Sequence, residues 1–390
     1  MKKTIALILA AVLLGGVLTA CGTQREAVPA TGSDISETPA AEQHETPAAE
    51  VTGTVRSYSE LRRAFDADTV VLTVNGRDVQ WHELFFWITS AVDTLEANYG
   101  EVKDFSAAFL DEGPDGSYQA YVLQSAIDAV SQYRALDGFA EALGAELSEE
   151  SRNAIRVQEI SDMGYVGVTD EEDFNDSLYS MNMTRELYDY LNRDAYLVGD
   201  CFAASFGADG SGCSDAEALA YAEENEFVQV KHLLFSTTDD ANEPLSESEI
   251  AQKREKAEAA RQTLLAADDR EAAMDAMLSD SDDPGSTYYT DGYVFTHGKM
   301  VQAFEDASYA LEVGGVSEVV ETDYGFHVIL RLPLDIDAAV EYVSADEQYS
   351  LRYYAASAIF NERLGDAMDS AEAVRLPVLE TLDLQALLNG

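Results

Sequence analysis

The chain has few basic residues: 24 lysines and arginines stand against 73 aspartates and glutamates, which gives a formal net charge of −49. Proteins that bind nucleic acid need clustered lysine and arginine to contact phosphates, and the sequence has no such stripe. The composition therefore argues against nucleic-acid binding. An acidic surface of this kind keeps a protein soluble and opposes self-association.

Cysteine is also scarce, with three residues at Cys21, Cys201 and Cys213. This number excludes a disulfide-rich scaffold. Cys201 and Cys213 could form a disulfide in an extracytoplasmic setting, or they could remain as two unpaired thiols. Neither has a histidine close to it in the sequence, so a catalytic thiol is not predicted.

No apolar run near the start of the sequence reaches the length of about 20 residues that a bilayer-spanning helix requires. Two lysines precede an apolar run over residues 5–17, and Leu-Thr-Ala at 18–20 precedes Cys21. This order is typical of a cleaved signal peptide over residues 1–20, and it resembles a bacterial lipobox. We therefore expect a lipid on the Cys21 sulfur that holds the protein at the outer face of the cell membrane. The alternative is an ordinary secretory signal followed by a chance cysteine.

Residues 21–67 contain few aromatic residues and are rich in Ala, Thr, Glu, Pro and Ser, which predicts a flexible tether. A strand is expected at 69–74, because Asn75-Gly76 favours a tight turn directly after it. Apolar residues at helical spacing then predict helices over 78–99, 119–143, 148–162, 170–180 and 184–206. Residues 68–225 are therefore predicted to form a mostly helical domain. A capping box at Ser214–Glu217 opens a further helix at its end.

A compact α+β unit is predicted over residues 226–333. A strand is expected at 226–236, and Ser246–Glu249 caps a long helix. A second helix covers about 270–279, a short strand 292–295 and a third helix 300–311. Two further strands enclose the turn at Asp323–Gly325. The segment therefore combines a four-stranded antiparallel sheet with three to four helices.

The helical pattern resumes in residues 334–390. Ser344–Glu347 reads as another capping box, and Tyr353, Phe360 and Leu364 follow on one helical face. This segment is too small to bury a core by itself. It is therefore expected to pack on the helical domain of 68–225 and to complete it.

The most specific pattern lies in residues 226–333. His232 and His327 are each followed by apolar β-formers, which is how strands carry polar side chains into a small sheet. Between them stand Ser-Asp-Asp-Pro-Gly-Ser at 281–286, Gly-Lys-Met at 298–300 and Phe-Glu-Asp-Ala at 304–307. This ordered set resembles the parvulin family of peptidyl-prolyl isomerases. Together with the flanking helices, it resembles secreted foldases of the PrsA and SurA type.

The resemblance implies four catalytic residues. His232 and His327 match the two buried histidines of parvulins, and Thr322 stands near them in the second motif. Asp283 matches a position that holds cysteine in some parvulins and aspartate in others, with Asp282 or Ser281 as the alternatives if the register differs by one or two residues. The residues alone also allow the Asp-Asp-Pro-Gly segment to be a solvated turn.

The resemblance also implies a substrate pocket. Met300 and Phe304 match the residues that hold the proline ring, and their spacing places them on one face of the predicted helix. An apolar slot suits a pyrrolidine, which has no N–H to satisfy. Tyr324 and Phe326 are assigned to the same pocket. Core packing is the plain alternative for such apolar residues.

The resulting hypothesis is a membrane-anchored foldase that isomerises X-Pro bonds in exported proteins and holds unfolded chains, without cofactor or metal. Two departures from the family, Gly292 and Tyr324, motivate an alternative in which the parvulin domain is degenerate and only binds. A third hypothesis is a metal site on His232, His327 and Asp283. Acidic residues follow the first motif, so recognition of phosphoserine-proline is not predicted, and regular βα alternation typical of solute-binding proteins is missing.

Overall fold

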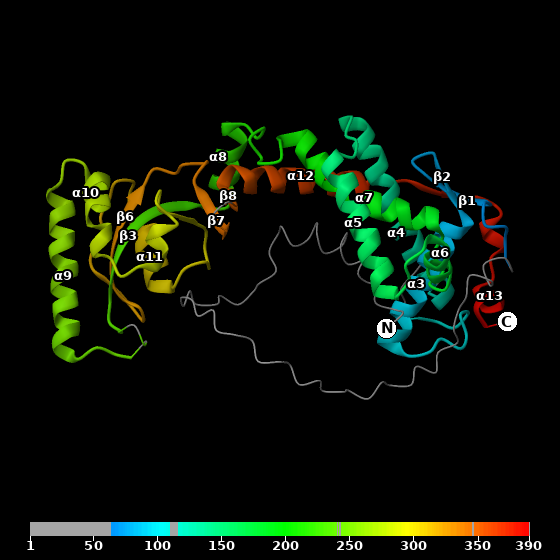
Figure 1. Ribbon diagram of the computed structural model, residues 1–390, viewed down its shortest axis with the longest axis horizontal. Coiled ribbons are helices and arrows are strands. Elements are labelled where there is room, and N and C mark those ends of the chain that lie inside the picture. The colour runs from blue at the N-terminus through cyan, green and yellow to red at the C-terminus, as the bar shows by residue number, and fades with distance from the viewer. Residues whose placement is uncertain (1–63, 110–115, 240, 242, 345–346, 390) are drawn as a thin grey trace. The chain divides into compact units, whose positions relative to one another are not determined.

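The computed structural model describes residues 64–109, 116–239, 241, 243–344 and 347–389 (Figure 1). The predicted signal peptide, Cys21 and nearly all of the predicted tether lie outside these residues. The described chain divides into two compact units. The helical unit comprises residues 64–208 and 358–389, and the sheet unit comprises residues 209–357. The sheet unit is thus longer at both ends than the domain predicted at 226–333.

The helical unit contains a three-stranded antiparallel sheet in the order β2-β1-β9. β1 (Val70–Val74) and β2 (Arg77–Gln80) are joined by Asn75 and Gly76, both at positive φ, as a tight turn of this composition requires. β2 corrects the expectation that a helix begins at residue 78. The turn reverses the chain, so residues 77–80 pair with β1 before the helix begins at residue 81.

The helices of this unit follow the predicted periodicity closely. Side chains of Ser117, Ser148, Asp170 and Thr184 cap the N-termini of four of them, because each accepts a hydrogen bond from a backbone N–H of the first turn. The elements are α3 (Trp81–Tyr99), α4 (Tyr118–Leu143), α5 (Glu149–Val166), α6 (Glu171–Tyr179), α7 (Arg185–Phe206), η3 (Leu379–Thr381) and α13 (Leu384–Asn389).

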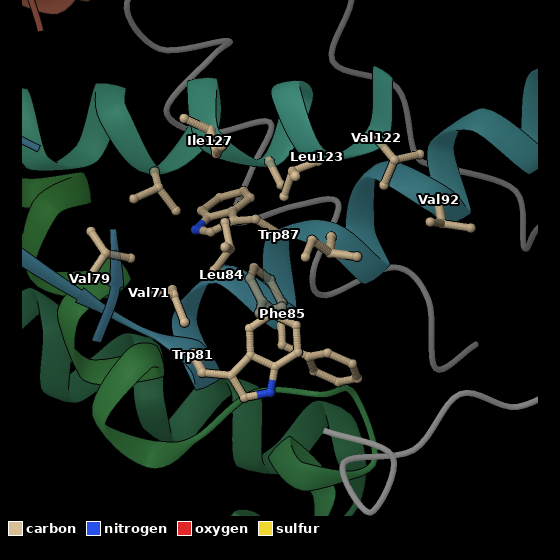
Figure 2. Close-up of a cluster of buried hydrophobic side chains, with 14 of the residues drawn as sticks. Val71, Val79, Trp81, Leu84, Phe85, Trp87, Val92, Val122, Leu123 and Ile127 are labelled. Atoms are coloured by element: carbon tan, nitrogen blue, oxygen red, sulfur yellow. The ribbon is translucent and has the colours of Figure 1, made fainter. Parts of the chain in front are cut away.

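The core of the helical unit lies between α3, α4 and the small sheet. Figure 2 shows Trp81, Leu84, Phe85 and Trp87 of α3 within this core. Residues from the far end of the chain complete it. β9 (Ala373–Arg375) pairs with β1, and five leucines join the same cluster: Leu379, Leu382, Leu384, Leu387 and Leu388. Each buried leucine contributes about 1.5–3 kcal/mol of hydrophobic stabilisation, so this returning segment is a substantial part of the core.

The sheet unit is built on a four-stranded antiparallel sheet in the order β4-β3-β6-β5, which confirms the predicted α+β class. Its strands are β3 (Val228–Ser236), β4 (Tyr293–Phe295), β5 (Val320–Thr322) and β6 (Gly325–Leu332). β3 and β6 pair over eight residues in the centre, with His232 opposite Ile329 and Leu234 opposite His327.

Helices cover both faces of this sheet (Figure 1). α9 (Glu247–Ala266) and α10 (Arg270–Met277) pack on the face that carries Leu233, Phe326 and Val328. α11 (Gln302–Ala310) packs on the opposite face, against Val230 and Ile329. Successive strand residues point to opposite faces, so the register decides which side chains can share a site. The short elements α8 (Asp215–Glu224), η1 (Leu278–Asp280) and η2 (Pro284–Thr287) complete this part.

The capping boxes predicted at Ser214 and Ser246 are both formed. The one predicted at Ser344 is wrong: β7 (Ala339–Ser344) pairs there with β8 (Glu347–Ser350), and α12 (Leu351–Asp369) begins after it. The β-forming residues of 339–344 outweigh the local capping signal once a partner strand is available.

Cys201 is a buried free thiol, so the alternative of a Cys201–Cys213 disulfide is not formed. Burial raises the pKa of the Cys201 thiol to about 11, which makes it a poor nucleophile near neutral pH. Cys213 is buried as well. Within the part of the chain that the structure describes, no helix is both long enough and apolar enough to cross a bilayer.

Candidate active site

The two predicted histidines meet on one face of the central strands. His232 on β3 and His327 on β6 point to the face covered by α11, and their ring centroids lie 5.3 Å apart. Their Nδ1 atoms are 3.3 Å apart, within hydrogen-bond reach. Both side chains are buried. The antiparallel register therefore brings together two residues that are far apart in the sequence.

Asp283 lies on the other side of His232. Its Oδ2 atom is 3.3 Å from His232 Nε2, and the Tyr293 hydroxyl donates to the same oxygen at 2.7 Å. The backbone N–H of Gly285 donates to Oδ1 at 3.2 Å. Of the three residues considered for this position, Asp283 is the one whose carboxylate faces the imidazole.

The side chains of the two alternative residues, Asp282 and Ser281, hold the loop in place instead. The Asp282 carboxylate accepts a hydrogen bond from the Ser236 N–H and pairs with Lys253. The Ser281 hydroxyl accepts from the backbone N–H of Leu234. These bonds tie the loop to the end of β3 and to α9, and they leave the Asp283 side chain at the site.

Thr322 extends the network beyond His327. Its hydroxyl lies 2.8 Å from His327 Nε2 and accepts the backbone N–H of Tyr324 at 3.1 Å. A neutral imidazole has one donor and one acceptor, so one consistent direction follows. Thr322 donates to His327 Nε2, His327 donates through Nδ1 to His232, and His232 donates through Nε2 to Asp283. Every polar atom of the two rings then has a partner.

The surroundings of the site set its charge. Burial and the neighbouring His232 lower the pKa of His327 to about 3, so its ring is neutral near neutral pH. Burial opposes ionisation of Asp283, but hydrogen bonds from His232 and Tyr293 outweigh it and hold the pKa of the carboxyl below its ordinary value. Burial and the Asp283 charge raise the pKa of the Tyr293 hydroxyl, which therefore stays a donor.

An apolar wall borders the imidazoles. The Phe304 ring packs edge-on against His232 and His327, with centroid distances of 5.0 and 5.3 Å. Met300 packs against the same cluster. The predicted pair therefore does lie together, but the helical reason was wrong. α11 begins at Gln302, and Met300 belongs to the extended turn before it.

Tyr293 is the residue that sequence reasoning missed. It is the first residue of β4, and its partner in the ladder is Val230, so its ring is carried to the same face as His232. Its ring stacks on Tyr289 at 4.6 Å. Two glycines make room: a Cβ at Gly285 would lie 2.0 Å from the Tyr293 hydroxyl, and one at Gly292 would lie 2.6 Å from the Val230 carbonyl oxygen. The alternation of side chains along the strand predicted at 292–295 could have indicated that Tyr293 faces the site.

The other two predicted pocket residues differ in their placement. Tyr324 lies at the β5–β6 turn, is 40% exposed, and is adjacent to the site through Thr322. Phe326 is not brought to the site. It is 1% exposed in the core under α9 and α10. Adjacent strand residues face opposite sides, so Phe326 cannot share a face with His327.

The same geometry bears on the metal hypothesis. The His232 and His327 Nδ1 atoms face each other, and the remaining nitrogens face Asp283 and Thr322. Among the residues described, no group of three or more His, Cys, Asp and Glu side chains could hold a metal ion. The hypothesis of a metal centre on His232, His327 and Asp283 is therefore wrong for this arrangement.

Comparison with known proteins shows which families the chain is similar to. Residues 217–331 match the family model described as the PPIC-type PPIase domain. A foldase protein PrsA from Geobacillus sp. (strain WCH70) is 56% identical over 50 residues, which cover 13% of this chain and 18% of that protein. A foldase protein PrsA from Halalkalibacterium halodurans is 25% identical over 270 residues, covering 67% of this chain and 63% of the relative.

Among solved structures, PrsA from Bacillus subtilis is 18% identical and is covered over 99% of its chain and 83% of this one, with a TM-score of 0.24. This chain spans less than two thirds of the length of each of the two curated relatives named above. Residues 217–331 are thus similar to the PPIC-type peptidyl-prolyl isomerase domain, and the chain is similar to the PrsA foldases.

Proposed function

We propose that the whole protein is a foldase that catalyses cis/trans isomerisation of X-Pro bonds in exported polypeptides. The observation that carries this proposal is the hydrogen-bonded row of Asp283, His232 and His327 beside the apolar wall of Phe304 and Met300. This is the arrangement that twisting a prolyl amide calls for: an apolar surface for the ring and fixed polar groups for the amide.

The barrier to this reaction comes from amide resonance. A twist of about 90° removes the resonance, which costs about 18–20 kcal/mol. No bond is broken, so neither a nucleophile nor a proton donor to a leaving group is required. Polar groups fixed before the reaction stabilise the twisted state because they need not reorganise as the charge distribution changes.

Each residue of the site would have a separate role in this reaction. Phe304 and Met300 offer an apolar surface that excludes water from the ring. The Asp283 carboxylate keeps its negative charge because of its donors, and this charge would act on the twisted amide. His327 stays neutral and holds the orientation of His232. Thr322 anchors the far end of the network.

The proposal also covers where the protein acts and which polypeptides it binds. The lipobox-like residues before Cys21 support a lipid anchor on an extracytoplasmic membrane surface. Clients would then be exported polypeptides that are not yet folded and that contain X-Pro bonds. The helical unit would hold such chains while the sheet unit acts on them. The test of the anchor is mass spectrometry of the mature protein, where a diacylated Cys21 is expected and an unmodified one would contradict the anchor.

Cis/trans exchange of an unphosphorylated X-Pro peptide tests the activity. The full chain should accelerate exchange as followed by NMR, and Met300→Ala should reduce the acceleration several-fold through loss of apolar contact with the ring. Val301→Ala is the matched control, because Val301 is the next residue but is 42% exposed. Background exchange with the wild-type chain would disprove the enzymatic role.

The second candidate is a chaperone whose parvulin domain binds proline segments without catalysis. Phe304 is only 4% exposed, and Gly292 stands where the family carries an apolar pocket residue, so the ring-binding surface is small. Suppression of client aggregation by both the wild type and a His232→Ala/Asp283→Ala variant, with background X-Pro exchange in both, would favour this candidate.

A further inference from the structure

A second cavity lies in the helical unit, remote in sequence from the parvulin motifs. It offers about 240 Å³ of space, is open to solvent, and lies between β1, β2, the start of α3, and the helices α4 and α7. Nothing in the X-Pro chemistry uses it.

The wall of this cavity carries more negative than positive charge. Asp78, Glu83 and Glu186 line it, and Arg134 is the only lysine or arginine among its lining residues. Arg134 is already engaged, because it pairs with Glu83 at 2.5 Å and with Asp137 at 3.6 Å. Burial lowers the pKa of His82, which also lines the cavity, so this ring adds no positive charge near neutral pH.

The side chain of Glu83 gives the main evidence for a ligand. Its side chain is 4% exposed, and only Oε2 is paired, with Arg134. Within the described chain, its buried Oε1 atom has no hydrogen-bond partner. A buried acceptor without a partner costs about 1–3 kcal/mol, and more when it is charged. A donor that entered the cavity would remove this cost.

A buried ionic cluster lies beside Glu83. Arg193 pairs with Asp137 and with Asp194, and the Asp194 Oδ2 atom also lacks a partner among the residues described. Glu83, Asp137 and Asp194 thus share two arginines. Burial raises the pKa of Glu83 and that of Asp194, the latter to about 7, so a cation that entered the cavity would favour the ionised carboxylates.

The cavity also has apolar surface. Val70, Leu187 and Tyr190 line it beside the carboxylates. Lysine and arginine side chains combine an apolar stem with a cationic head that only donates hydrogen bonds. Their chemistry fits this wall: the stem against Val70 and Leu187, and the head toward Glu83, with Asp78 and Glu186 at the exposed rim.

We propose that this cavity binds a lysine or arginine side chain of an unfolded polypeptide. The site would give the helical unit a preference for basic segments of its clients. This inference rests on the proposed function, because it names the substrate chemistry of the holding role assigned to the helical unit.

The experiment uses the full chain and a short, proline-free, Gly/Ser-rich peptide with blocked ends and a central arginine. The control peptide carries citrulline, which has nearly the same shape without the charge. Fluorescence anisotropy should show about tenfold weaker binding of the citrulline peptide, as expected for the loss of one charge-assisted hydrogen bond. Equal binding of the two peptides would overturn the proposal.

The matched protein variants separate the site from the general acidity of the chain. Asp78→Asn/Glu186→Gln removes two rim carboxylates and should weaken arginine-peptide binding about tenfold. Glu101→Gln/Glu146→Gln changes the net charge equally at exposed loop positions away from the cavity, and it should leave binding within about twofold. Equal losses in the two variants would mean that the overall field attracts the peptide, and the site would be refuted.

Glu83→Gln provides a further check, with circular dichroism to verify folding. This substitution should also weaken binding of the arginine peptide. If the Glu83→Gln variant misfolds, the Asp78→Asn/Glu186→Gln variant still tests the proposal, because Asp78 and Glu186 lie outside the buried cluster. The peptide has no proline, so its failure to bind would refute only this cavity. Loss of X-Pro exchange and of aggregation suppression in the wild type would instead refute the proposed function.

Discussion

The two units handle buried polar groups in opposite ways. In the sheet unit, the row from Thr322 through His327 and His232 to Asp283 pairs each ring nitrogen and keeps one imidazole neutral. In the helical unit, the cluster around Arg134 leaves buried atoms of Glu83 and Asp194 without partners among the described residues. A satisfied network fixes geometry, whereas an incompletely satisfied one is poised to gain from a ligand. The comparison separates a site built for precise positioning from one suited to binding.

The largest expected effect breaks the ionic cluster. Arg134→Met should destabilise the helical unit by about 3 kcal/mol, because it leaves the buried Glu83 without its cation. Both tryptophans, Trp81 and Trp87, lie in the core of this unit, so their fluorescence during urea unfolding reports on it alone.

The control for this prediction is Arg156→Met, which removes an exposed arginine of α5. It should change the free energy of unfolding by less than about 0.5 kcal/mol. Similar losses from both substitutions would mean that the buried cluster adds nothing beyond an ordinary surface arginine.

Acidification should destabilise the sheet unit, whereas in the helical unit the lowered pKa of His82 and the raised pKa of Asp194 act in opposite directions. The pKa of His327 is about 3 in the folded chain and about 6.5 when unfolded, so the unfolded state binds the extra proton below pH 6.5. The stability of the sheet unit should therefore fall as the pH drops, by about 3 kcal/mol near pH 4.5. Burial raises the pKa of Asp194 to about 7, so its contribution is present at low pH and is lost as the pH rises through about 7.

Hydrogen exchange with mass spectrometry resolves the two units in one sample. On going from about pH 7 to about pH 4.5, protection corrected for intrinsic rates should fall in β3 and β6, and it should fall less in α3 and α4. His327→Gln should reduce the fall in the sheet, and Asp194→Asn should enlarge the fall in the helices. An equal fall of protection in the two units would contradict this prediction.

Removing the charge of Asp283 tests its proposed positioning role directly. Asp283→Asn keeps the shape of the side chain and should lower kcat/KM for an X-Pro peptide about 100-fold, the usual effect of losing one fixed polar group. Asp282→Asn is the matched control, since that carboxylate faces Lys253 and the end of β3. Equal activity of the two variants would move the working carboxylate away from Asp283.

The smallest effect concerns Tyr293. Tyr293→Phe removes one donor to Asp283 and should lower kcat/KM about tenfold, as expected for a hydrogen bond to a charged group. The pKa of Asp283 should rise, so the acid limb of the pH profile should move to higher pH. Tyr289→Phe keeps the stacked pair and should leave the acid limb in place.

Much of the site could be predicted from the sequence because it depends on strand registers and motif order. The histidines, Thr322 and Asp283 meet as the resemblance to parvulins implies. The assignment of Phe326 to the pocket was wrong for a reason that is visible in the sequence. Phe326 directly precedes His327 in one strand, so the two side chains face opposite sides. Tyr293 was missed because its role depends on the pairing of β4 with β3, which no local pattern reveals.

The helical unit was harder to predict. Apolar periodicity located its helices, since that signal is local. β2 was hidden because four residues after a turn carry little periodicity. In the sheet unit, the capping box predicted at Ser344 was wrong because a partner strand outweighed the capping signal. The Glu83 cavity combines residues from five elements, and only the tertiary packing brings them together.

The returning segment that pairs β9 with β1 has a consequence for biogenesis. The described sheet unit is one uninterrupted stretch of the chain, residues 209–357, so it can fold while the rest of the chain is still being synthesised. The helical unit must wait for its last leucines before its core is complete. A newly made copy would then complete the sheet unit first, and the helical unit would close only after synthesis of the C-terminal segment.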